Sequence, residues 1–184
     1  MNGQAMGGQA VRDPTVASTV ALAGAGDEAA FAQLVASYHA DMARVALVAC
    51  GDRELAQDAV QSAWLVAWRK LHSLRDPGRV RPWLLSVTAN EARQIVRRRR
   101  GPVVEIDVEA PGDARGDPCE GIERVDLRRA LARLSDDDRA VLGLHYGVDL
   151  TSDELAAALG TSPSTARKRL SRAIDRLRKE LRDG

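Results

Sequence analysis

Residues 151–181, TSDELAAALGTSPSTARKRLSRAIDRLRKEL, decide the fold of the C-terminal part of the chain. Thr151, with Glu154 three residues later, forms a capping box that predicts the start of a short helix. Gly160 predicts the end of this helix, because glycine adopts the left-handed conformation without a Cβ penalty. The apolar face of the helix is formed by Leu155, Ala156 and Leu159. The stretch therefore begins with a short amphipathic helix and a tight turn.

A longer helix is predicted after the turn, since Ser162 can cap it and Pro163 suits its first position. Residues 167–182 hold eight bases and two acids, whereas the whole chain carries a net charge of only +1. The apolar face of this helix is formed by Leu170, Ala173, Ile174, Leu177 and Leu181. Two helices joined by a glycine turn, the second one basic, predict a helix-turn-helix that lays its second helix in the DNA major groove. The alternative is a helical hairpin whose bases are only a solvated face.

The composition predicts an all-α protein. Apolar residues make up 45% of the 184 residues, but only one Phe and two Tyr are present, which favours Ala- and Leu-rich helical packing over a β core. Cys50 and Cys119 show no C-x-x-C spacing and the three histidines are scattered, so we expect no metal, no cofactor and no disulfide. No apolar run is long enough to span a bilayer, and residues 16–25 lack the basic segment of a signal peptide. We therefore expect a cytoplasmic protein.

Helical periodicity organises the first part of the chain. Residues 1–26 are rich in Gly and Ala without periodicity, and we expect a disordered tail there. Apolar residues then recur at helical spacing in a domain over residues 27–100, with one helix ending at Gly51 and a second capped by Asp52. A third helix follows an irregular segment over residues 72–81. The three tryptophans lie on apolar stripes, so we assign them to the core.

Residues 101–121 separate this domain from the helix-turn-helix. They contain three prolines, four glycines and six acids against one base, a composition that predicts a flexible acidic linker. Helical spacing resumes at Ile122, and Ser135 with Asp138 predicts the cap of a further helix. The second domain, residues 122–184, is therefore expected to hold four helices. The predicted fold class is all-α, with two small helical domains joined by the linker.

Three motifs of the first domain resemble region two of bacterial sigma factors: DAVQSAWLVAW at residues 58–68, RPWL at residues 81–84, and NEAR at residues 90–93 before an arginine cluster. Two further motifs, LARLS at residues 131–135 and TARKRLSRA at residues 165–173, resemble region four. With only an acidic linker between these regions, the chain is similar to the extracytoplasmic-function (ECF) sigma factors. The resemblance implies a protein that is not an enzyme but binds core RNA polymerase and directs promoter recognition, melting and transcription initiation.

The resemblance also implies where polymerase binds. In the family, the second helix of the first domain contacts the clamp helices of the large polymerase subunit, and the matching positions here are Asp58, Gln61, Ser62 and Leu65. The family often has an acid at the position of Ser62. Without the resemblance, these residues would be interpreted as an ordinary solvated helix face. The second domain is implied to hold the flap tip of the other large subunit.

Binding of the minus-ten promoter element is implied for the end of the first domain. Residues 72–83 match the loop that captures an unstacked base in the family, and Asn90 matches the asparagine that reads this base. An amide suits this role because it pairs with a base edge as both donor and acceptor. The basic residues implied to bind the same single strand are Arg79, Arg81, Arg93, Arg97 and Arg98, with Arg99 and Arg100 extending the groove.

Binding of the minus-thirty-five element in duplex form is implied for the second helix of the helix-turn-helix. The residues implied to face this DNA are Ser164, Thr165, Arg167, Lys168, Arg169 and Arg172. We expect Arg167 and Arg172 to hold phosphates and the other four to face base edges. Ala166 stands where the family mostly has a larger aliphatic residue.

Weak DNA contacts from each domain suit a protein tethered to polymerase, because tethering raises the effective concentration of the second site once the first is bound. In the free protein we expect a monomer in which the acidic linker and docking of the two domains mask DNA binding. The family further implies an anti-sigma protein as a partner, which covers the polymerase-binding faces.

Two other functions compete with this interpretation. An operator-binding repressor or activator would use the first domain for dimerisation or ligand binding, but it leaves the motifs at residues 58–68 and 81–100 unexplained. A nuclease would use the acids at residues 136–138, which we interpret instead as carboxylates at a helix start. A gel shift with and without core polymerase separates the three functions.

Overall fold

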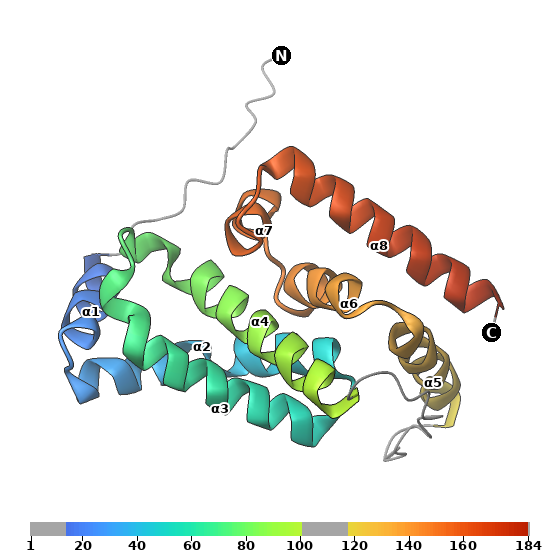
Figure 1. Ribbon diagram of the computed structural model, residues 1–184, viewed down its shortest axis with the longest axis horizontal. Coiled ribbons are helices and arrows are strands. Elements are labelled where there is room, and N and C mark those ends of the chain that lie inside the picture. The colour runs from blue at the N-terminus through green and yellow to red at the C-terminus, as the bar shows by residue number, and fades with distance from the viewer. Residues whose placement is uncertain (1–13, 101–117, 184) are drawn as a thin grey trace.

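The computed structural model describes residues 14–100 and 118–183 of the chain. Every regular element within these residues is a helix, which confirms the all-α prediction (Figure 1). Figure 1 shows α1 to α4 gathered on one side of the molecule and α5 to α8 on the other, so the two expected helical domains are recognisable. None of the described helices is both long enough and apolar enough to cross a membrane.

The first domain packs three long helices around a core of small side chains. It consists of α1 (Pro14–Gly24), α2 (Glu28–Cys50), α3 (Arg53–Lys70) and α4 (Val80–Arg100), with the short 3-10 turns η1 (Leu71–Ser73) and η2 (Pro77–Arg79) before α4. Helices α2, α3 and α4 contact one another, and the fully buried side chains at their centre include Met42, Ala46, Ala59, Ala63, Leu85 and Ala92. Alanines at the contacts let the helix axes approach closely. The Ala- and Leu-rich core expected from the composition is therefore present.

Capping residues close in sequence set the start and end of α2 and the start of α3. Asp27 Oδ1 accepts a hydrogen bond from Ala30 N at 2.7 Å at the start of α2, and Gly51 ends α2 with a φ of 69°. Asp52 Oδ1 then accepts a hydrogen bond from Leu55 N at 2.9 Å at the start of α3. The predicted helix end at Gly51 and the predicted cap at Asp52 are both confirmed.

Helix α1 corrects one prediction, because its residues fall inside the expected disordered tail. Val20 and Ala23 are buried in the core, and α1 packs on α2, η1 and η2. Gly24 lies so close to η1 that an added Cβ would be 3.4 Å from His72 Cα. Small residues thus allow α1 to pack tightly, although the same residues give it the composition of a linker. Residues 1–13 of the expected tail lie outside the described residues.

The second domain holds the four α-helices predicted for it. They are α5 (Pro118–Arg133), α6 (Asp136–Leu142), α7 (Ser152–Ala158) and α8 (Pro163–Asp183), with a π-helical turn η3 (Gly143–Gly147) after α6. Helix α5 begins at Pro118, earlier than the predicted Ile122, because proline suits the first helical position. The rest of the expected linker, residues 101–117, lies outside the described residues. Ser135 Oγ accepts a hydrogen bond from Asp138 N at 3.2 Å, which confirms the predicted cap of α6.

The helix-turn-helix is formed by α7 and α8. Thr151 Oγ1 accepts a hydrogen bond from Glu154 N at 3.3 Å, and Glu154 Oε2 accepts one from Thr151 N at 3.0 Å, so the capping box is confirmed. Gly160 has a φ of 60° in the turn, and Ser162 Oγ accepts a hydrogen bond from Thr165 N at 3.3 Å. Leu181 differs from the prediction, since it is 44% exposed near the end of α8 rather than buried.

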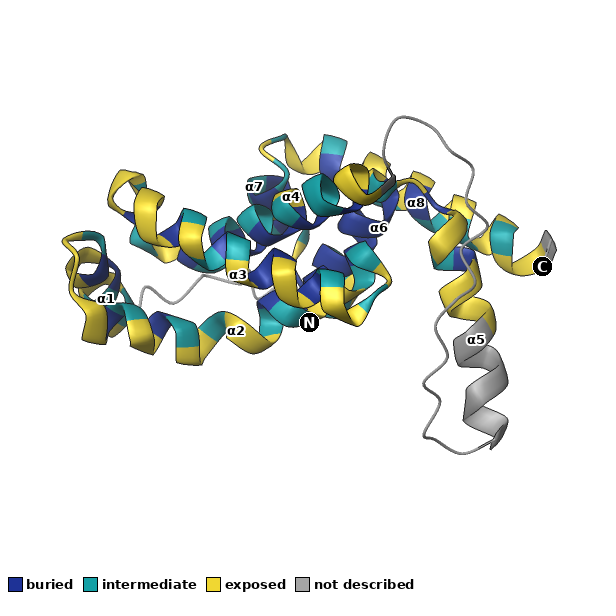
Figure 2. Cartoon of the chain, turned by 60° about the horizontal axis from the view of Figure 1, so that its bottom comes forward, coloured by how far each residue is buried: buried dark blue, intermediate teal, exposed yellow. Residues whose placement is uncertain are grey.

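The two domains share part of one core. Helix α2 contacts α6 and η3, and α4 contacts α6 and α7; the buried segments of α4, α6 and α7 lie together in Figure 2. Gly143 allows a close approach at this seam, because an added Cβ would lie 3.2 Å from Val48 Cβ and 3.3 Å from Val45 O. The apolar cluster that crosses the seam includes Val45, Ala140, Leu144, Val148 and Leu150. In this structure the domains are therefore docked.

Candidate DNA and polymerase interfaces

Helix α8 separates its charges from its packing residues. Ala166 and Ala173 are fully buried against the domain, whereas the bases on the other side of the helix are exposed. The exposed residues predicted to face minus-thirty-five DNA are Ser164, Arg167, Lys168, Arg169 and Arg172. Thr165 is half-buried, and its hydroxyl lies 2.9 Å from Ser162 Oγ within the cap of the helix. The structure therefore gathers all six predicted residues in the first part of α8.

One further ion pair, not expected from the sequence, orients α8. Arg176 donates through one nitrogen to both carboxylate oxygens of Asp138, at 2.9 Å and 2.6 Å, and so joins α8 to the start of α6. The Asp138 side chain also accepts a hydrogen bond from Ser135 Oγ at 2.6 Å. Because Asp138 is 8% exposed and held from both sides, it limits how α8 can tilt on the domain.

The polymerase residues predicted on α3 share one face of that helix. Asp58, Gln61 and Leu65 are exposed and Ser62 is half-buried, at a spacing of three and four residues. Leu65 is 59% exposed. Trp68 continues the same face and is 41% exposed, so its assignment to the core is wrong. The Trp68 ring packs edge-on against Phe31 at a centroid distance of 4.8 Å, which leaves part of the indole at the surface.

The residues predicted for minus-ten DNA divide into two groups. Arg79 of η2 and Arg97 and Arg98 near the end of α4 are exposed. Asn90 and Arg93 are brought together, because Arg93 donates a hydrogen bond to the side-chain oxygen of Asn90. Arg93 of this second group, together with Arg81 at the start of α4, also contacts the other domain.

Arg93 and Arg81 both bridge the domains. Arg93 donates to Asp137 Oδ1 of α6 at 2.5 Å. Arg81 donates to Asp41 Oδ2 at 3.1 Å within the first domain and to Val148 O of the second at 2.7 Å. The set of partners is completed by a longer ion pair between Arg81 and Glu154, at 3.7 Å.

Arg139 was missed by sequence reasoning, although it is the most deeply buried charge at the seam. Its side chain is 3% exposed and donates to four backbone carbonyls: Ala49 O at 3.0 Å, Leu134 O at 3.0 Å, Ala132 O at 3.1 Å and Leu131 O at 3.3 Å. It also pairs with Asp136. The available signal was a lone arginine that precedes the apolar run at residues 140–142.

The acids at residues 136–138 are all used in ion pairs with different helices. Asp136 pairs with Arg139, Asp137 with Arg93 and Asp138 with Arg176. Each carboxylate thus pairs with a different arginine, and the described residues contain no group of three His, Cys, Asp or Glu side chains that could hold a metal ion. This arrangement does not favour the nuclease considered above.

Cys50 is a free thiol at the end of α2. Burial raises the pKa of the Cys50 thiol from 9.0 to about 12, and nearby Arg139 opposes the rise only in part. A thiol that stays protonated is a poor nucleophile and a poor redox sensor.

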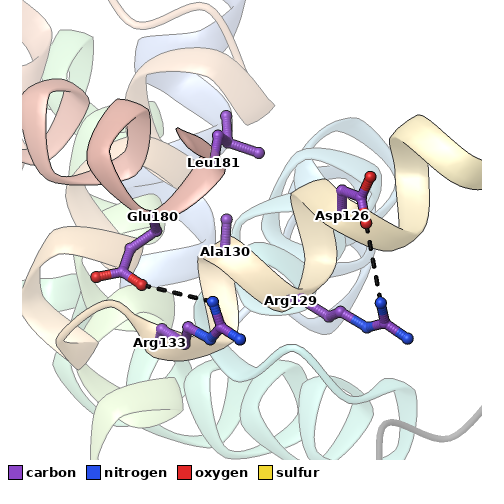
Figure 3. A pocket seen from close by; sticks show the side chains of 6 residues that line it. All are labelled: Asp126, Arg129, Ala130, Arg133, Glu180 and Leu181. Atoms are coloured by element: carbon purple, nitrogen blue, oxygen red, sulfur yellow. Dashed lines mark ion pairs between the residues drawn. The ribbon is translucent and has the colours of Figure 1, made fainter. Parts of the chain in front are cut away.

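A shallow hollow lies between α5 and α8, away from the residues predicted to read DNA (Figure 3). Figure 3 shows Ala130 and Leu181 at its centre, with Arg133 paired to Glu180 at 3.9 Å and Arg129 paired to Asp126 at 3.9 Å at its edges. The charges at its rim are thus already paired, and the hollow offers only a small apolar surface. Binding of a polymerase flap by this domain stays a prediction.

Comparison with known proteins adds independent information. The chain matches the sigma-70 region 2 family over residues 34–101 and the sigma-70 region 4 family over residues 124–177. It is 31% identical over 161 residues to the ECF RNA polymerase sigma factor RpoE of Cereibacter sphaeroides. The matched residues make up 84% of this chain and 88% of RpoE. It is 32% identical over 168 residues to the protein named "Probable RNA polymerase sigma factor RfaY" of Xanthomonas campestris pv. campestris. That match covers 86% of this chain but only 42% of RfaY.

A solved structure shares the whole arrangement. The structure of CnrH in complex with the cytosolic domain of CnrY resembles this fold with a TM-score of 0.68 and 26% sequence identity. The likeness covers 92% of this chain and 98% of that chain, so it includes both domains.

Proposed function

This chain belongs to the extracytoplasmic-function (ECF) sigma factors of RNA polymerase, which act in transcription initiation, and we propose that three separate surfaces of the fold bind its partners. Helix α3 binds core polymerase, η2 and α4 bind single-stranded minus-ten DNA, and α8 binds duplex minus-thirty-five DNA. The observation that carries this proposal is α8, whose bases are exposed on one side while Ala166 and Ala173 are fully buried on the other. A helix that docks in the major groove presents its basic face to the DNA and packs its apolar face on its own domain.

The α3 surface has the chemistry of a protein contact. Leu65 and Trp68 present exposed apolar atoms, and Asp58 and Gln61 offer polar groups beside them. An apolar centre with a polar rim is the usual anatomy of a protein interface, and a partly exposed tryptophan is a frequent hot spot. We assign this surface to the large polymerase subunit.

For minus-ten DNA we assign base reading to Asn90 and backbone binding to the arginines around it. Arg79, Arg97 and Arg98 are exposed and already available to phosphates. Arg81 and Arg93 join them only when they leave the second domain. Melting would then expose a base that the Asn90 amide can pair with on both its donor and acceptor sides.

We further propose an anti-sigma protein as a partner and the cytoplasm as the place of action. The first proposal is supported by the likeness to CnrH, whose structure was solved with the cytosolic domain of CnrY. The second is supported by the partners, since core polymerase and promoter DNA are found there. An operator-binding repressor is not favoured, because both sigma regions occur in order along the chain.

Run-off transcription on genomic DNA with core polymerase tests the proposal. The wild-type protein should direct initiation at discrete sites, and replacing Lys168 and Arg169 by alanine should reduce it roughly 10- to 100-fold, since one good base contact is worth ~1–3 kcal/mol. The matched control removes the same charge from the other end of α8, with Arg178→Ala and Lys179→Ala. The variant Asp58→Ala/Gln61→Ala/Leu65→Ala should lose core polymerase in a pull-down while keeping duplex DNA. The proposal fails if the wild-type protein gives no site-selective transcript.

A further inference from the structure

Helix α1 packs against η1 and η2, the two turns at which capture of a minus-ten base is expected. We propose that α1 is a brace that holds these turns in the conformation that receives the base, with Val20, Ala23 and Gly24 as its positioning residues. This inference rests on the proposed minus-ten function of η2 and α4, and it adds an element to which no ligand is assigned. The match to the sigma-70 region 2 family begins at residue 34, so it does not include α1.

The two turns are short and depend on contacts from outside. Leu74 N donates to Leu71 O at 3.0 Å at the end of η1, and Arg79 N donates to Asp76 O at 3.0 Å in η2. These bonds shape each turn, but they do not join the turns to the rest of the domain. The hydrogen bonds of a 3-10 turn are also poorer in geometry than those of an α-helix. The position of the loop must therefore be fixed by packing.

Helix α1 supplies this packing. Among the described residues, η1 and η2 pack mainly on α1, apart from the helices α3 and α4 that flank them in the chain. Gly24 lies against the backbone of η1, since an added Cβ would be 3.4 Å from His72 Cα, 3.5 Å from His72 N and 3.7 Å from Leu71 C. Val20 and Ala23 are buried in the same core as Leu71. Small side chains thus bring the end of α1 close to the loop.

The C-terminal end of α1 is itself fixed to α2. Asp27 N donates to Leu22 O at 3.0 Å and Gly26 N donates to Ala23 O at 3.1 Å, while Gly26 has a φ of 96°. These two bonds around a left-handed glycine form a Schellman motif. Asp27 is in turn the cap of α2. The connection between the two helices is therefore defined residue by residue, and α1 cannot tilt away from the loop without breaking it.

The brace and the loop stabilise each other. An isolated helix of 11 residues is marginal in water, so α1 depends on its packing against η1, η2 and α2. A loop that samples several conformations binds with an affinity reduced by the fraction of the competent one. Loosening α1 should therefore weaken base capture, while Arg97 and Arg98 at the other end of α4 still bind phosphates.

Valine at position 24 loosens the brace. The Cβ of Gly24→Ala is in ordinary contact with His72, whereas Gly24→Val adds two γ carbons to a Cβ that already has three backbone atoms within 3.7 Å. Gly24→Ala is therefore the matched control at the same position. Ala21→Val is the second control, because it places a valine at an exposed position of α1.

The assay measures how strongly binding depends on a single base. Each protein is assembled with core polymerase and titrated, by anisotropy, against a labelled single strand that spans the minus-ten region of a promoter mapped by run-off transcription. The strand is used intact and with one abasic site at each position in turn. For the wild-type protein we expect one position at which the abasic site weakens binding at least about 10-fold, since a captured base is held by stacking.

The abasic ratio at this position, the affinity for the intact strand divided by that for the abasic strand, reports the brace. In Gly24→Val the ratio should fall to about 2 or less, and both controls should keep the wild-type ratio. Binding of core polymerase and of the minus-thirty-five duplex should be equal in all four proteins. In hydrogen exchange of the free proteins, the amides of Leu74 and Arg79 should exchange at least ~10-fold faster in Gly24→Val than in Gly24→Ala.

The outcomes separate the brace from the function on which it rests. An abasic ratio in Gly24→Val equal to that in Gly24→Ala would overturn the brace and leave the minus-ten assignment in place. If no abasic site weakens binding by the wild-type protein, the minus-ten assignment is wrong and the brace falls with it.

A second variant covers the case in which Gly24→Val fails to fold and loses core polymerase. Val20→Ala removes buried atoms from α1 without adding any, and it should also lower the abasic ratio. Leu22→Ala is its control, because Leu22 is exposed on the same helix. Equal abasic ratios in Val20→Ala and Leu22→Ala would then overturn the brace.

Discussion

Replacing Arg139 by methionine tests how the second domain is held in place. The buried guanidinium of Arg139 donates to carbonyls in the last turns of two helices, Ala49 O of α2 at 3.0 Å and Ala132 O of α5 at 3.1 Å. Carbonyls at helix ends have no partner within the helix, so this one side chain replaces the water that would otherwise bind them. It also pairs with Asp136, which is itself mostly buried.

The expected cost follows from these contacts. Methionine retains an apolar stem of similar length but removes every N–H donor of the guanidinium. Each buried acceptor left without a donor costs ~1–3 kcal/mol. Removal of one partner from a buried ion pair costs roughly 3–5 kcal/mol, and Asp136 keeps some contact with water. These costs are not additive, because they belong to one side chain and water reaches the carbonyls when the local packing relaxes. We therefore expect the free energy of unfolding to fall by about 3–4 kcal/mol, a large share of the ~5–15 kcal/mol typical of a domain.

Urea unfolding with two probes measures this change. All three tryptophans lie in the first domain, so their fluorescence reports that domain, whereas circular dichroism reports the helices of both. With a urea m-value of about 2–3 kcal/mol/M, the dichroism midpoint of Arg139→Met should fall by ~1–2 M, and the fluorescence midpoint by less. The control is Arg128→Met, the same change at an exposed position of α5. A dichroism midpoint within about 0.3 M of this control would refute the reasoning.

Two further predictions concern single residues, partly buried Cys50 and fully buried Ala166. Since burial raises the pKa of the Cys50 thiol from 9.0 to about 12, its alkylation by iodoacetamide at pH 8 in a Cys119→Ser background should be at least ~100-fold slower in the native protein than in urea. Unfolding then releases the Cys50 proton above pH 9, so stability should fall with rising pH between pH 9 and 12 more steeply than in Cys50→Ala, and equal slopes in urea titrations would contradict the raised pKa. Ala166 of α8 is fully buried in the core, so Ala166→Leu should overpack the helix-turn-helix, lower the free energy of unfolding by ~1–3 kcal/mol and weaken duplex binding in a gel shift. The same change at exposed Ala132 of α5 should do neither.

Helical periodicity alone assigned residues to helix faces, and the resemblance to sigma regions two and four assigned functions to those faces. Asp58, Gln61 and Leu65 lie on the outer face of α3, as their spacing requires, and Lys168 and Arg169 lie opposite the buried face of α8. Residues that meet across helices could not be assigned this way. The pairing of Arg93 with Asp137 joins positions 44 residues apart, and no local pattern links them.

The fold, like the interfaces, has features set by local sequence and features set by contacts between distant residues. Helix ends such as those at Gly51, Asp52 and Thr151 depend on residues within one turn, so the amino-acid order alone determined them. The packing of α1, the seam at Gly143 and the burial of Arg139 were decided only in three dimensions, because each depends on which surfaces meet. A buried guanidinium is destabilising unless carbonyls accept its hydrogen bonds, and one acceptor of Arg139, Ala49 O, lies 90 residues away in the sequence.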